Sequence, residues 1–295
     1  MVNSTEAGVF DLEMNHFISD EEINFFSSSF IWDVLNEETK DLFEIRSIEG
    51  SGRELSFSAV ITQRKKHPYS EGGFHLSAIT ASEIIQFAIG SNHNDILNDF
   101  RLSSHQITCV KTIRSKQPKF RIKVESKSAS RIVINFEAEK KSYFGLMVFS
   151  RKICPHPKIK IKRENRNFVK PHIKKAKIVR KKLLAELIFD WQSSARDNFG
   201  LRPDLLLALL AQLAIVQLYT MSTATSKQSG VVLISSTIHL GNKWNHNDQM
   251  NFVLETRKFR KSKKHDNHVV AEIGFSGSKH EFSGSAVYFF EPMDA

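Results

Sequence analysis

Cysteine is scarce in this sequence. Only two, Cys109 and Cys154, occur among 295 residues, and their spacing fits no metal site. A disulfide framework is therefore excluded, and a reducing compartment is favoured, because small secreted domains depend on disulfides. The N-terminal residues are acidic and lack the basic start and apolar core of a signal peptide. We therefore expect the protein to reside in the cytoplasm.

Several motifs that would reveal a cofactor or a catalytic nucleophile are also missing. The sequence contains no glycine-rich phosphate-binding loop, no zinc-ligand pattern and no nucleophile elbow. We therefore expect neither a metal nor a cofactor. The aromatic-rich motifs of RNA-binding domains are absent too, which argues against nucleic acid as a partner.

The longest apolar run is too short for a membrane span. It extends from Leu205 to Tyr219 and is interrupted by Gln212 and Gln217, whereas a transmembrane helix needs about 20 apolar residues. Apolar character on all sides is also typical of a helix buried within a protein. We therefore predict no membrane span, and a core helix within residues 201–221.

Charge is unevenly distributed along the chain. The net charge is +10, and twelve Lys or Arg residues lie between Lys158 and Lys182 with one acid among them, Glu164. Residues 1–50 instead have an excess of acids. A basic block of this kind can bind nucleic acid, an anionic membrane surface or an acidic protein, or can serve as a solvated linker.

The first half of the chain predicts a strand, a helix and then a series of strands. Apolar and polar residues alternate over 54–63, and a helical pattern follows over 74–90. Segments enriched in β-branched and aromatic residues then predict four antiparallel strands at 99–113, 119–127, 130–141 and 143–152. Residues 1–50 have short helical patterns and form a lead-in segment.

The second half repeats this order, with strands predicted at 183–192, 230–240, 250–259, 267–277 and 282–291 and the helix after the first of them. A shift of about 129 residues superimposes the two helices, and Gly145 matches Gly284 near the end of each copy.

We interpret this as a duplication and predict an α+β fold of two tandem hotdog units, each a central buried helix wrapped by a curled antiparallel sheet. The predicted organisation is a lead-in at 1–50, repeat one at 51–155, a basic linker at 156–182 and repeat two at 183–295.

Candidate site residues follow from how hotdog enzymes bind acyl thioesters. The thioester reaches the N-terminal part of the central helix, where free backbone N–H groups polarise its carbonyl. In the first copy this region contains His67, His75, Ser77, Glu83 and Gln86. Glu83 is the strongest catalytic candidate, because burial raises a carboxyl pKa toward a useful range, and the two histidines are alternative bases. Ser77 and Gln86 are candidate substrate-binding residues, although Ser77 could equally cap the helix.

The matching region of the second copy contains Arg202, Asp204 and Gln212. Gln212 falls at the position of Glu83, so a catalytic carboxylate is missing there. A guanidinium such as that of Arg202 can bind a carboxylate or phosphate through two hydrogen bonds. Pro203 and Asp204 are also the residues expected in the first turn of a helix. We predict that Arg202, Asp204 and Gln212 contact substrate.

Two stretches resemble a known family. "GGFHLSAITASEIIQFA" and "LRPDLLLALLAQLAIVQLYTMSTATSKQSGVVLISSTIHL" look like the helical regions of the avirulence protein D (AvrD) family, whose members have Arg-Pro-x-Leu helix starts in each half. The resemblance extends from about residue 55 onward. In the first half this chain has Gly73 and Phe74 where that pattern has Arg-Pro.

The resemblance implies an enzyme that joins a β-ketoacyl chain to a ketose and so makes a syringolide-type signal. The A-factor synthesis (AfsA) family, also built from two hotdog repeats, joins a β-ketoacyl carrier thioester to a phosphorylated three-carbon alcohol. The reaction would need a general base for the hydroxyl and stabilisation of the oxyanion.

We therefore predict an acyltransferase or condensing enzyme that uses acyl carrier protein (acyl-ACP) or acyl-CoA thioesters, acting as a monomer or homodimer. The basic linker would bind the acidic acyl carrier protein. Two alternatives remain. One is a hotdog dehydratase or thioesterase, with His67 and Glu83 favouring dehydration. The other is a non-catalytic binding protein that uses the linker.

Overall fold

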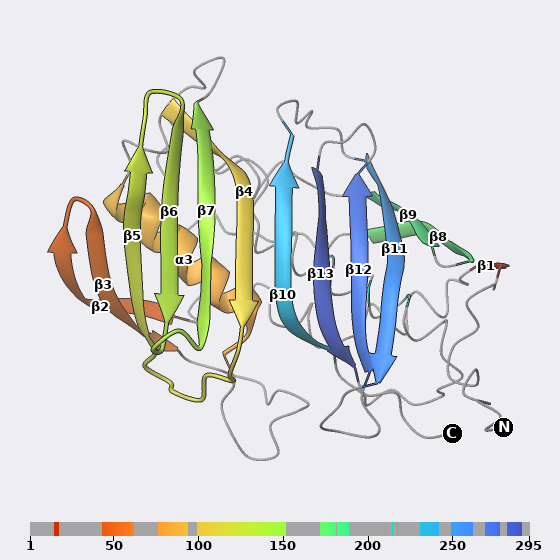
Figure 1. Ribbon diagram of the computed structural model, residues 1–295, viewed down its shortest axis with the longest axis horizontal. Helices are drawn as coiled ribbons and strands as arrows, with labels where there is room; N and C mark the ends of the chain where they lie inside the picture. Colours follow the sequence, from red (N-terminus) through yellow and green to blue (C-terminus); the bar gives the residue numbers. More distant parts are fainter. Residues whose placement is uncertain are drawn as a thin grey trace, which may run out of the picture.

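A computed structural model of the chain describes most of the predicted strands and the first of the two helices (Figure 1). The described residues are 15–17, 43–61, 76–93, 99–151, 172–180, 182–188, 210, 214, 217, 231–241, 249–261, 269–277 and 282–290. The apolar stretch 201–221 therefore lies almost entirely outside them. No helix within the described ranges is both long enough and apolar enough to cross a membrane.

The described strands form one antiparallel sheet in the order β1-β8-β9-β11-β12-β13-β10-β4-β7-β6-β5-β3-β2. The first half contributes β2 (Phe43–Ser51), β3 (Glu54–Ile61), β4 (Phe100–Cys109), β5 (Lys119–Lys127), β6 (Arg131–Ala138) and β7 (Tyr143–Arg151). The second half contributes β8 (His172–Val179), β9 (Lys182–Ile188), β10 (Val231–Leu240), β11 (Gln249–Lys261), β12 (Val269–Gly277) and β13 (Phe282–Phe290). The short β1 (Asn15–Phe17) pairs with β8 at one edge.

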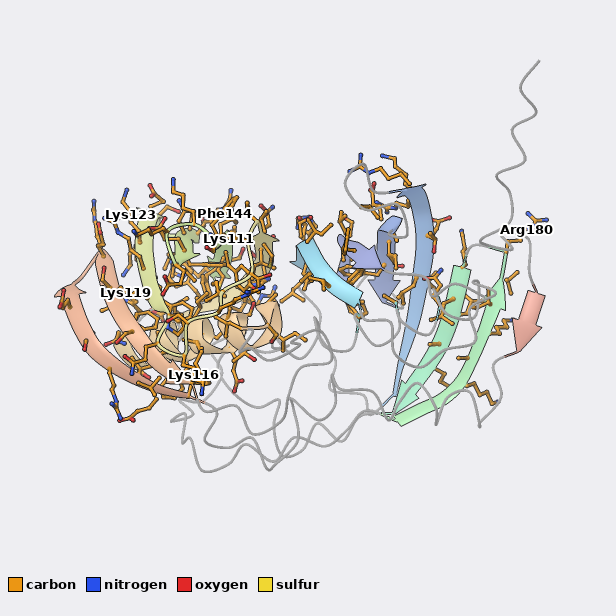
Figure 2. All side chains as sticks on the ribbon, turned by 90° about the horizontal axis from the view of Figure 1, so that it is seen from below. Lys111, Lys116, Lys119, Lys123, Phe144 and Arg180 are labelled. Carbon is orange, nitrogen blue, oxygen red and sulfur yellow. The ribbon has the colours of Figure 1, made fainter. Side chains whose placement is uncertain are left out.

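Helix α3 (Ala78–Asn92) lies against one face of the first-half strands. It begins after Ser77, whose hydroxyl accepts a hydrogen bond from the Thr80 amide at 3.0 Å and so satisfies one of the unpaired N–H groups of the first turn. Strands β2 and β3 curve down beside the helix (Figure 2), and Phe43 of β2 packs edge-on against Phe87 of the helix. The helix is consequently buried on most of its circumference.

The two halves have the same strand order when each is followed from the centre of the sheet. The first runs β4-β7-β6-β5-β3-β2, and the second runs β10-β13-β12-β11-β9-β8. The predicted strands are present in both halves. Each half, however, begins one strand earlier than the sequence suggested, because β2 lies within the expected lead-in and β8 within the expected linker.

The lysines of strand β8 obscured its strand pattern in the sequence. Ala176 and Ile178 are buried, whereas Lys175 is exposed and Lys177 is half-buried. This is the apolar and polar alternation of a strand with one buried face, but the lysines made the segment look like part of a solvated basic block. The part of residues 156–182 that the structure describes therefore belongs largely to the sheet.

The close packing around one glycine is reproduced in both halves. Gly145 of β7 lies opposite Ile107 of β4, and Gly284 of β13 lies opposite Ile238 of β10. A Cβ atom on Gly145 would collide with the Gln106 carbonyl and the Phe136 ring. On Gly284 it would collide in the same way with the carbonyl of Thr237 and the ring of Phe275. The two glycines matched in the sequence thus occupy equivalent places.

The two halves are joined where β4 pairs with β10, and we call this pairing the central seam. Gln106 lies opposite Thr237 at its middle, with His105 opposite Ile238 on one side and Ile107 opposite Ser236 on the other. Because Ile107 and Ile238 are equivalent, His105 and Ser236 are equivalent too. The pairing is therefore symmetric about the Gln106 and Thr237 pair.

Candidate functional site

A β-bulge beside the central seam turns a histidine toward the helix. The register of β4 against β7 shifts between Leu102 and Ser104, and a bulge of this kind changes which residues of a strand face each side. His105 consequently faces α3 and is fully buried. Strand β10 has its own bulge between Leu233 and Ser235, so that Ser236 is turned inward in the same way.

His105 contacts a hydroxyl on the helix. Its Nε2 lies 3.4 Å from the Ser82 Oγ, and both side chains are fully buried. The imidazole stacks on the Phe136 ring with a centroid separation of 5.9 Å. An imidazole and a hydroxyl in an apolar setting can exchange a proton with each other or with a bound ligand.

Three polar residues in the middle of α3 form a continuous strip along one side of the helix. Ser82, Glu83 and Gln86 occupy about 100° of the helix circumference, because consecutive residues are about 100° apart. The Gln86 Nε2 donates a hydrogen bond to the Ser82 carbonyl at 3.0 Å. Ser82 and Gln86 are buried and Glu83 is half-buried. We call these three residues, together with His105, the polar strip.

Glu83 lies on the least covered side of the helix. Its neighbours one turn away in each direction, Ile79 and Phe87, are also only half-buried, whereas most other residues of α3 are buried. The Glu83 side chain thus has apolar neighbours on the same side of the helix and is still partly exposed to solvent. This setting suits an acid or base that acts on a molecule with an apolar tail.

Across the seam, Ser236 supplies a second polar group. Its side chain is 3 % exposed, and its Oγ has no hydrogen-bond partner among the described residues. Ser236 is the diagonal neighbour of His105 on the inner face of the two paired strands. A buried hydroxyl without a partner is uncommon in folded proteins and marks a place where a ligand or water completes the hydrogen bonding.

The start of α3 is held firmly by the end of the sheet. The Tyr143 hydroxyl donates a hydrogen bond to the Leu76 carbonyl at 2.5 Å, and the Leu76 amide donates to the Ile113 carbonyl at 3.0 Å. Ser77 caps the helix about 9 Å from Glu83, since six residues rise by 1.5 Å each. Ser77 therefore caps the helix, while its binding of substrate stays a prediction.

Burial determines the ionisation of two groups near this helix start. Desolvation raises the pKa of the Cys109 thiol to about 12, so the thiolate needed for nucleophilic attack is scarce at neutral pH. Burial also raises the pKa of Tyr143 above that of an exposed tyrosine. Neither group is suited to act as a base; Tyr143 belongs to the core, and Cys109 packs against it.

The predicted site residues divide into two groups. Glu83 and Gln86 lie together on the polar strip, and Ser77 lies at the start of the same helix. The others lie outside the described residues and stay predictions, namely His67, His75, Arg202, Asp204 and Gln212. Within the described ranges, no group of three His, Cys, Asp or Glu side chains is placed to hold a metal ion.

Sequence reasoning overlooked Ser82, His105 and Ser236. Regular alternation from Phe100 would place Ser104 inside and His105 outside. The bulge reverses this order, and a regular pattern in the sequence does not reveal it. One signal is present in the sequence: "LSSHQITC" (residues 102–109) in the first half resembles "LISSTIHL" (residues 233–240) in the second. Both stretches contain a pair of serines, and in the first stretch a histidine follows the pair. Polar residues therefore stand at positions where a core strand would otherwise be apolar.

Comparisons with known proteins place the fold but no family. No protein-family model matches the sequence, and no curated protein matches it. The structure is similar to that of the tesB protein of Mycobacterium avium subspecies paratuberculosis, with a TM-score of 0.53, 10 % identity, 89 % of this chain covered and 100 % of that one.

A second similar structure is a conserved protein of unknown function with a hot dog fold from Alicyclobacillus acidocaldarius, with a TM-score of 0.44, 10 % identity, and 84 % and 96 % of the two chains covered. The helix and the antiparallel sheet of this chain fit the hotdog fold that the sequence predicted.

Proposed function

We propose that the protein is an enzyme acting on acyl thioesters and that its two halves form a double hotdog. The observation that supports this function most directly is the polar strip, a carboxyl, an amide, a hydroxyl and an imidazole grouped on one buried apolar helix and the strand beside it. Polar groups are costly to bury and are retained at such places when they perform chemistry.

The double hotdog is supported by the mirrored strand order and by the symmetric central seam. Single hotdog units pair to build a site between them, and two fused copies supply that pairing within one chain. The structural similarity to the tesB protein covers both halves and is consistent with this architecture. The second central helix is proposed to lie within residues 201–221.

Within this site, Glu83 is the general base and the apolar surroundings receive the acyl chain. An acceptor hydroxyl loses its proton to Glu83 as its oxygen attacks the thioester carbonyl. A C–O bond forms and the C–S bond breaks, and the proton passes to the departing thiolate. The Ser236 hydroxyl donates a hydrogen bond to the oxyanion, and Gln86 lines the same site. His105 holds Ser82 and completes the polar lining.

The specific reaction we propose is condensation of a β-ketoacyl group, carried by an acyl carrier protein or CoA, with a ketose-like alcohol. The AvrD resemblance supports this choice of substrates. In the second copy, Arg202, Asp204 and Gln212 are proposed to contact the acceptor, with His67, His75 and Ser77 near the thioester. The enzyme would act in the cytoplasm, where carrier and CoA thioesters are made.

Dehydration is the second candidate function, and one observation favours it. Removal of water from a β-hydroxyacyl thioester needs one group to take the α-proton and another to protonate the leaving hydroxyl. The polar strip contains both a carboxyl, Glu83, and an imidazole, His105. Thioester hydrolysis would use the same groups with water as the acceptor.

Mass spectrometry separates these reactions. The purified protein is incubated with β-ketooctanoyl and β-hydroxyoctanoyl thioesters, each with and without a ketose such as xylulose. A product that contains both the acyl group and the ketose, formed only when both are present, supports condensation. Loss of water from the β-hydroxyacyl thioester without acceptor establishes a dehydratase instead, and release of free acid establishes a thioesterase. If no thioester changes mass, the proposed function is wrong.

A further inference from the structure

A positively charged surface borders the start of α3, at the end of the sheet that Figure 2 views from below. It consists of residues 110–119, which are the β4–β5 link and the first residue of β5, and residues 139–144, which are the β6–β7 turn and the first two residues of β7. We call this surface the basic rim. Its exposed cations are Lys111, Arg114, Lys116, Lys119, Lys140 and Lys141.

The two segments of the basic rim are bound to each other. The Ser142 carbonyl accepts a hydrogen bond from the Val110 amide at 2.8 Å. At the other end, the Lys119 amide donates to the Glu139 carboxylate at 2.8 Å, and the Glu139 amide donates to the Lys119 carbonyl at 2.9 Å. The cations are therefore displayed on one ordered surface.

The basic rim lacks neutralising charge. Glu139 is its only acid, and its carboxylate already accepts a backbone hydrogen bond. No ion pair to any of the six cations occurs among the described residues, although exposed cations elsewhere on this half are paired, such as Arg121 with Glu54 and Lys123 with Glu125. Uncompensated like charges on one surface create a potential that attracts an anionic partner.

Apolar side chains lie among these cations. Val110 is 69 % exposed and Phe144 is 39 % exposed, which makes them two of the three exposed large apolar residues in the described part of the chain. Figure 2 shows Phe144 close to Lys111, with Lys119 and Lys116 on the same half. Exposed apolar side chains together with charged ones are typical of a protein interface and exceed what a small anion needs.

The basic rim also adjoins the proposed active site. Ile113, a buried residue of the rim, accepts a hydrogen bond from the Leu76 amide, immediately before α3 begins. From Ser77 to Glu83 the helix rises by about 9 Å. A flexible arm anchored on the rim and following the helix would therefore bring a thioester to the polar strip.

The corresponding loops of the second half do not share this charge. Residues 110–118 and 139–142 contain five Lys or Arg residues and one acid, whereas residues 241–248 and 278–281 contain two Lys residues and two acids. The duplication therefore has one strongly basic end, and it is the end beside the helix that contains Glu83.

We infer that the basic rim is the docking surface for an acidic acyl carrier protein that delivers the thioester to α3. This inference rests on the proposed function and names the partner of the same site. Anionic groups on the carrier pair with the lysines, its apolar surface covers Val110 and Phe144, and its pantetheine arm enters beside the helix start. Such pairing accelerates association and weakens as salt screens it.

The test compares three charge-reversal variants that change the net charge equally. K111E/K116E alters the basic rim. R53E/R131E is the matched control, since both arginines are exposed on the same half but lie at the opposite end of its strands. K175E/R180E alters β8 and the turn after it, within the basic stretch that the sequence suggested, and Arg180 lies at the far end of the molecule in Figure 2.

Each variant is assayed with β-ketooctanoyl-ACP, β-ketooctanoyl-CoA and β-ketooctanoyl N-acetylcysteamine thioester. We expect K111E/K116E to raise the KM for the carrier thioester by about tenfold, with loss of its salt dependence, because surface charges act mainly on association. Turnover of the N-acetylcysteamine thioester should stay at the wild-type value. R53E/R131E and K175E/R180E should behave as wild type with all three substrates.

Four outcomes would overturn the inference. Equal losses with the CoA and carrier thioesters would show that the rim binds phosphate rather than a protein. A selective loss in K175E/R180E would move the docking surface to the basic stretch. Unchanged carrier kinetics in K111E/K116E, or binding of the wild type to phosphatidylglycerol vesicles but not to the carrier, would reject it as well. Failure of the proposed function is distinguishable, because then even the N-acetylcysteamine thioester would not react.

Discussion

The first and second halves of the protein share a scaffold and differ in their polar residues. Gly145 and Gly284 make the same close approach to a neighbouring strand, and both β4 and β10 have a bulge at the equivalent place. At equivalent positions, however, the first half has His105 where the second has Ser236, and Tyr143 where the second has Phe282. The two halves therefore share the backbone geometry that close packing requires, and they differ in the chemistry of their buried side chains.

The two halves therefore contribute different groups to the proposed site. The first half contributes a carboxyl, an imidazole and a hydroxyl, and it has the basic rim beside its helix. The second half contributes a buried hydroxyl from Ser236 and a glutamine, Gln217, whose Nε2 donates to the Leu254 carbonyl at 3.5 Å. In the function proposed above, the acid and base chemistry lies on α3, and the second half completes the walls of the site.

The largest expected loss of activity comes from replacing Glu83 by glutamine, the residue that the second half has at the matching position, Gln212. The substitution Glu83→Gln keeps the volume and removes the proton acceptor, so we expect kcat to fall by about 100-fold or more, the usual contribution of a general base. The thermal unfolding midpoint should change little, because the residue is half-buried. Unaltered kcat with β-ketooctanoyl thioesters would place the base elsewhere. Adding the opposite change, Gln212→Glu, to the Glu83→Gln variant should not restore the lost kcat.

The next effect tests the shared scaffold. Gly145→Ala and Gly284→Ala each place a methyl group against a backbone carbonyl and an aromatic ring. Overpacking of this kind costs about 1–3 kcal/mol, and we expect both substitutions to lower the free energy of unfolding in urea by similar amounts. If one half tolerates the methyl group and the other does not, the equivalence of the two halves is wrong at this point.

A smaller effect is expected from Tyr143→Phe, which gives the first half the residue of the second. The substitution removes the hydrogen bond to the Leu76 carbonyl and should cost about 1 kcal/mol at neutral pH. Burial raises the pKa of Tyr143, so the unfolded chain loses this proton first as pH rises above about 10.

The stability that Tyr143 provides is thus complete at neutral pH and declines under alkaline conditions. The difference in unfolding free energy between the wild type and Tyr143→Phe should therefore narrow as the pH is raised from about 9 to 11. A gap that widens with pH in urea titrations would contradict the assigned burial of the hydroxyl.

The smallest effect concerns Cys109, which corresponds to Leu240 in the second half, both packed partly against the core. With its pKa raised to about 12, the thiol should behave like the leucine and resist alkylation. In a Cys154→Ser background we expect iodoacetamide to modify the native protein at pH 8 at least about tenfold more slowly than the urea-unfolded chain, and faster as pH approaches 12. Rapid native alkylation at pH 8 would show an ionised thiol.

Much of the fold could be predicted because strands with one buried face have a strong period of two. The strand β5 was predicted with its observed bounds, and α3 was predicted within a few residues of its bounds. Strand β8 was not predicted, because lysines occupied its outer face and made it look like a linker. Strand β2 was assigned to the lead-in segment for lack of a clear boundary before it.

The candidate site could be predicted only in part, for a physical reason. Glu83 and Gln86 could be named as candidates because a polar residue in an apolar helix is visible in the sequence. His105 and Ser236 were not found, because bulges in their strands reverse the face that each residue occupies. A bulge adds one residue on one strand only, and its position depends on pairing between distant segments, which a local pattern does not contain.

The most direct test of the account is to label the site with its substrate. A β-ketoacyl pantetheine analogue with a photoreactive group at the end of its acyl chain is irradiated with the protein, and the modified peptides are identified by mass spectrometry. We predict saturable labelling of about one molecule per chain, on peptides containing α3 or β4, which unlabelled β-ketooctanoyl-CoA suppresses. Labelling of both halves at two molecules per chain, or labelling that does not saturate, would contradict a single thioester site built on the first half.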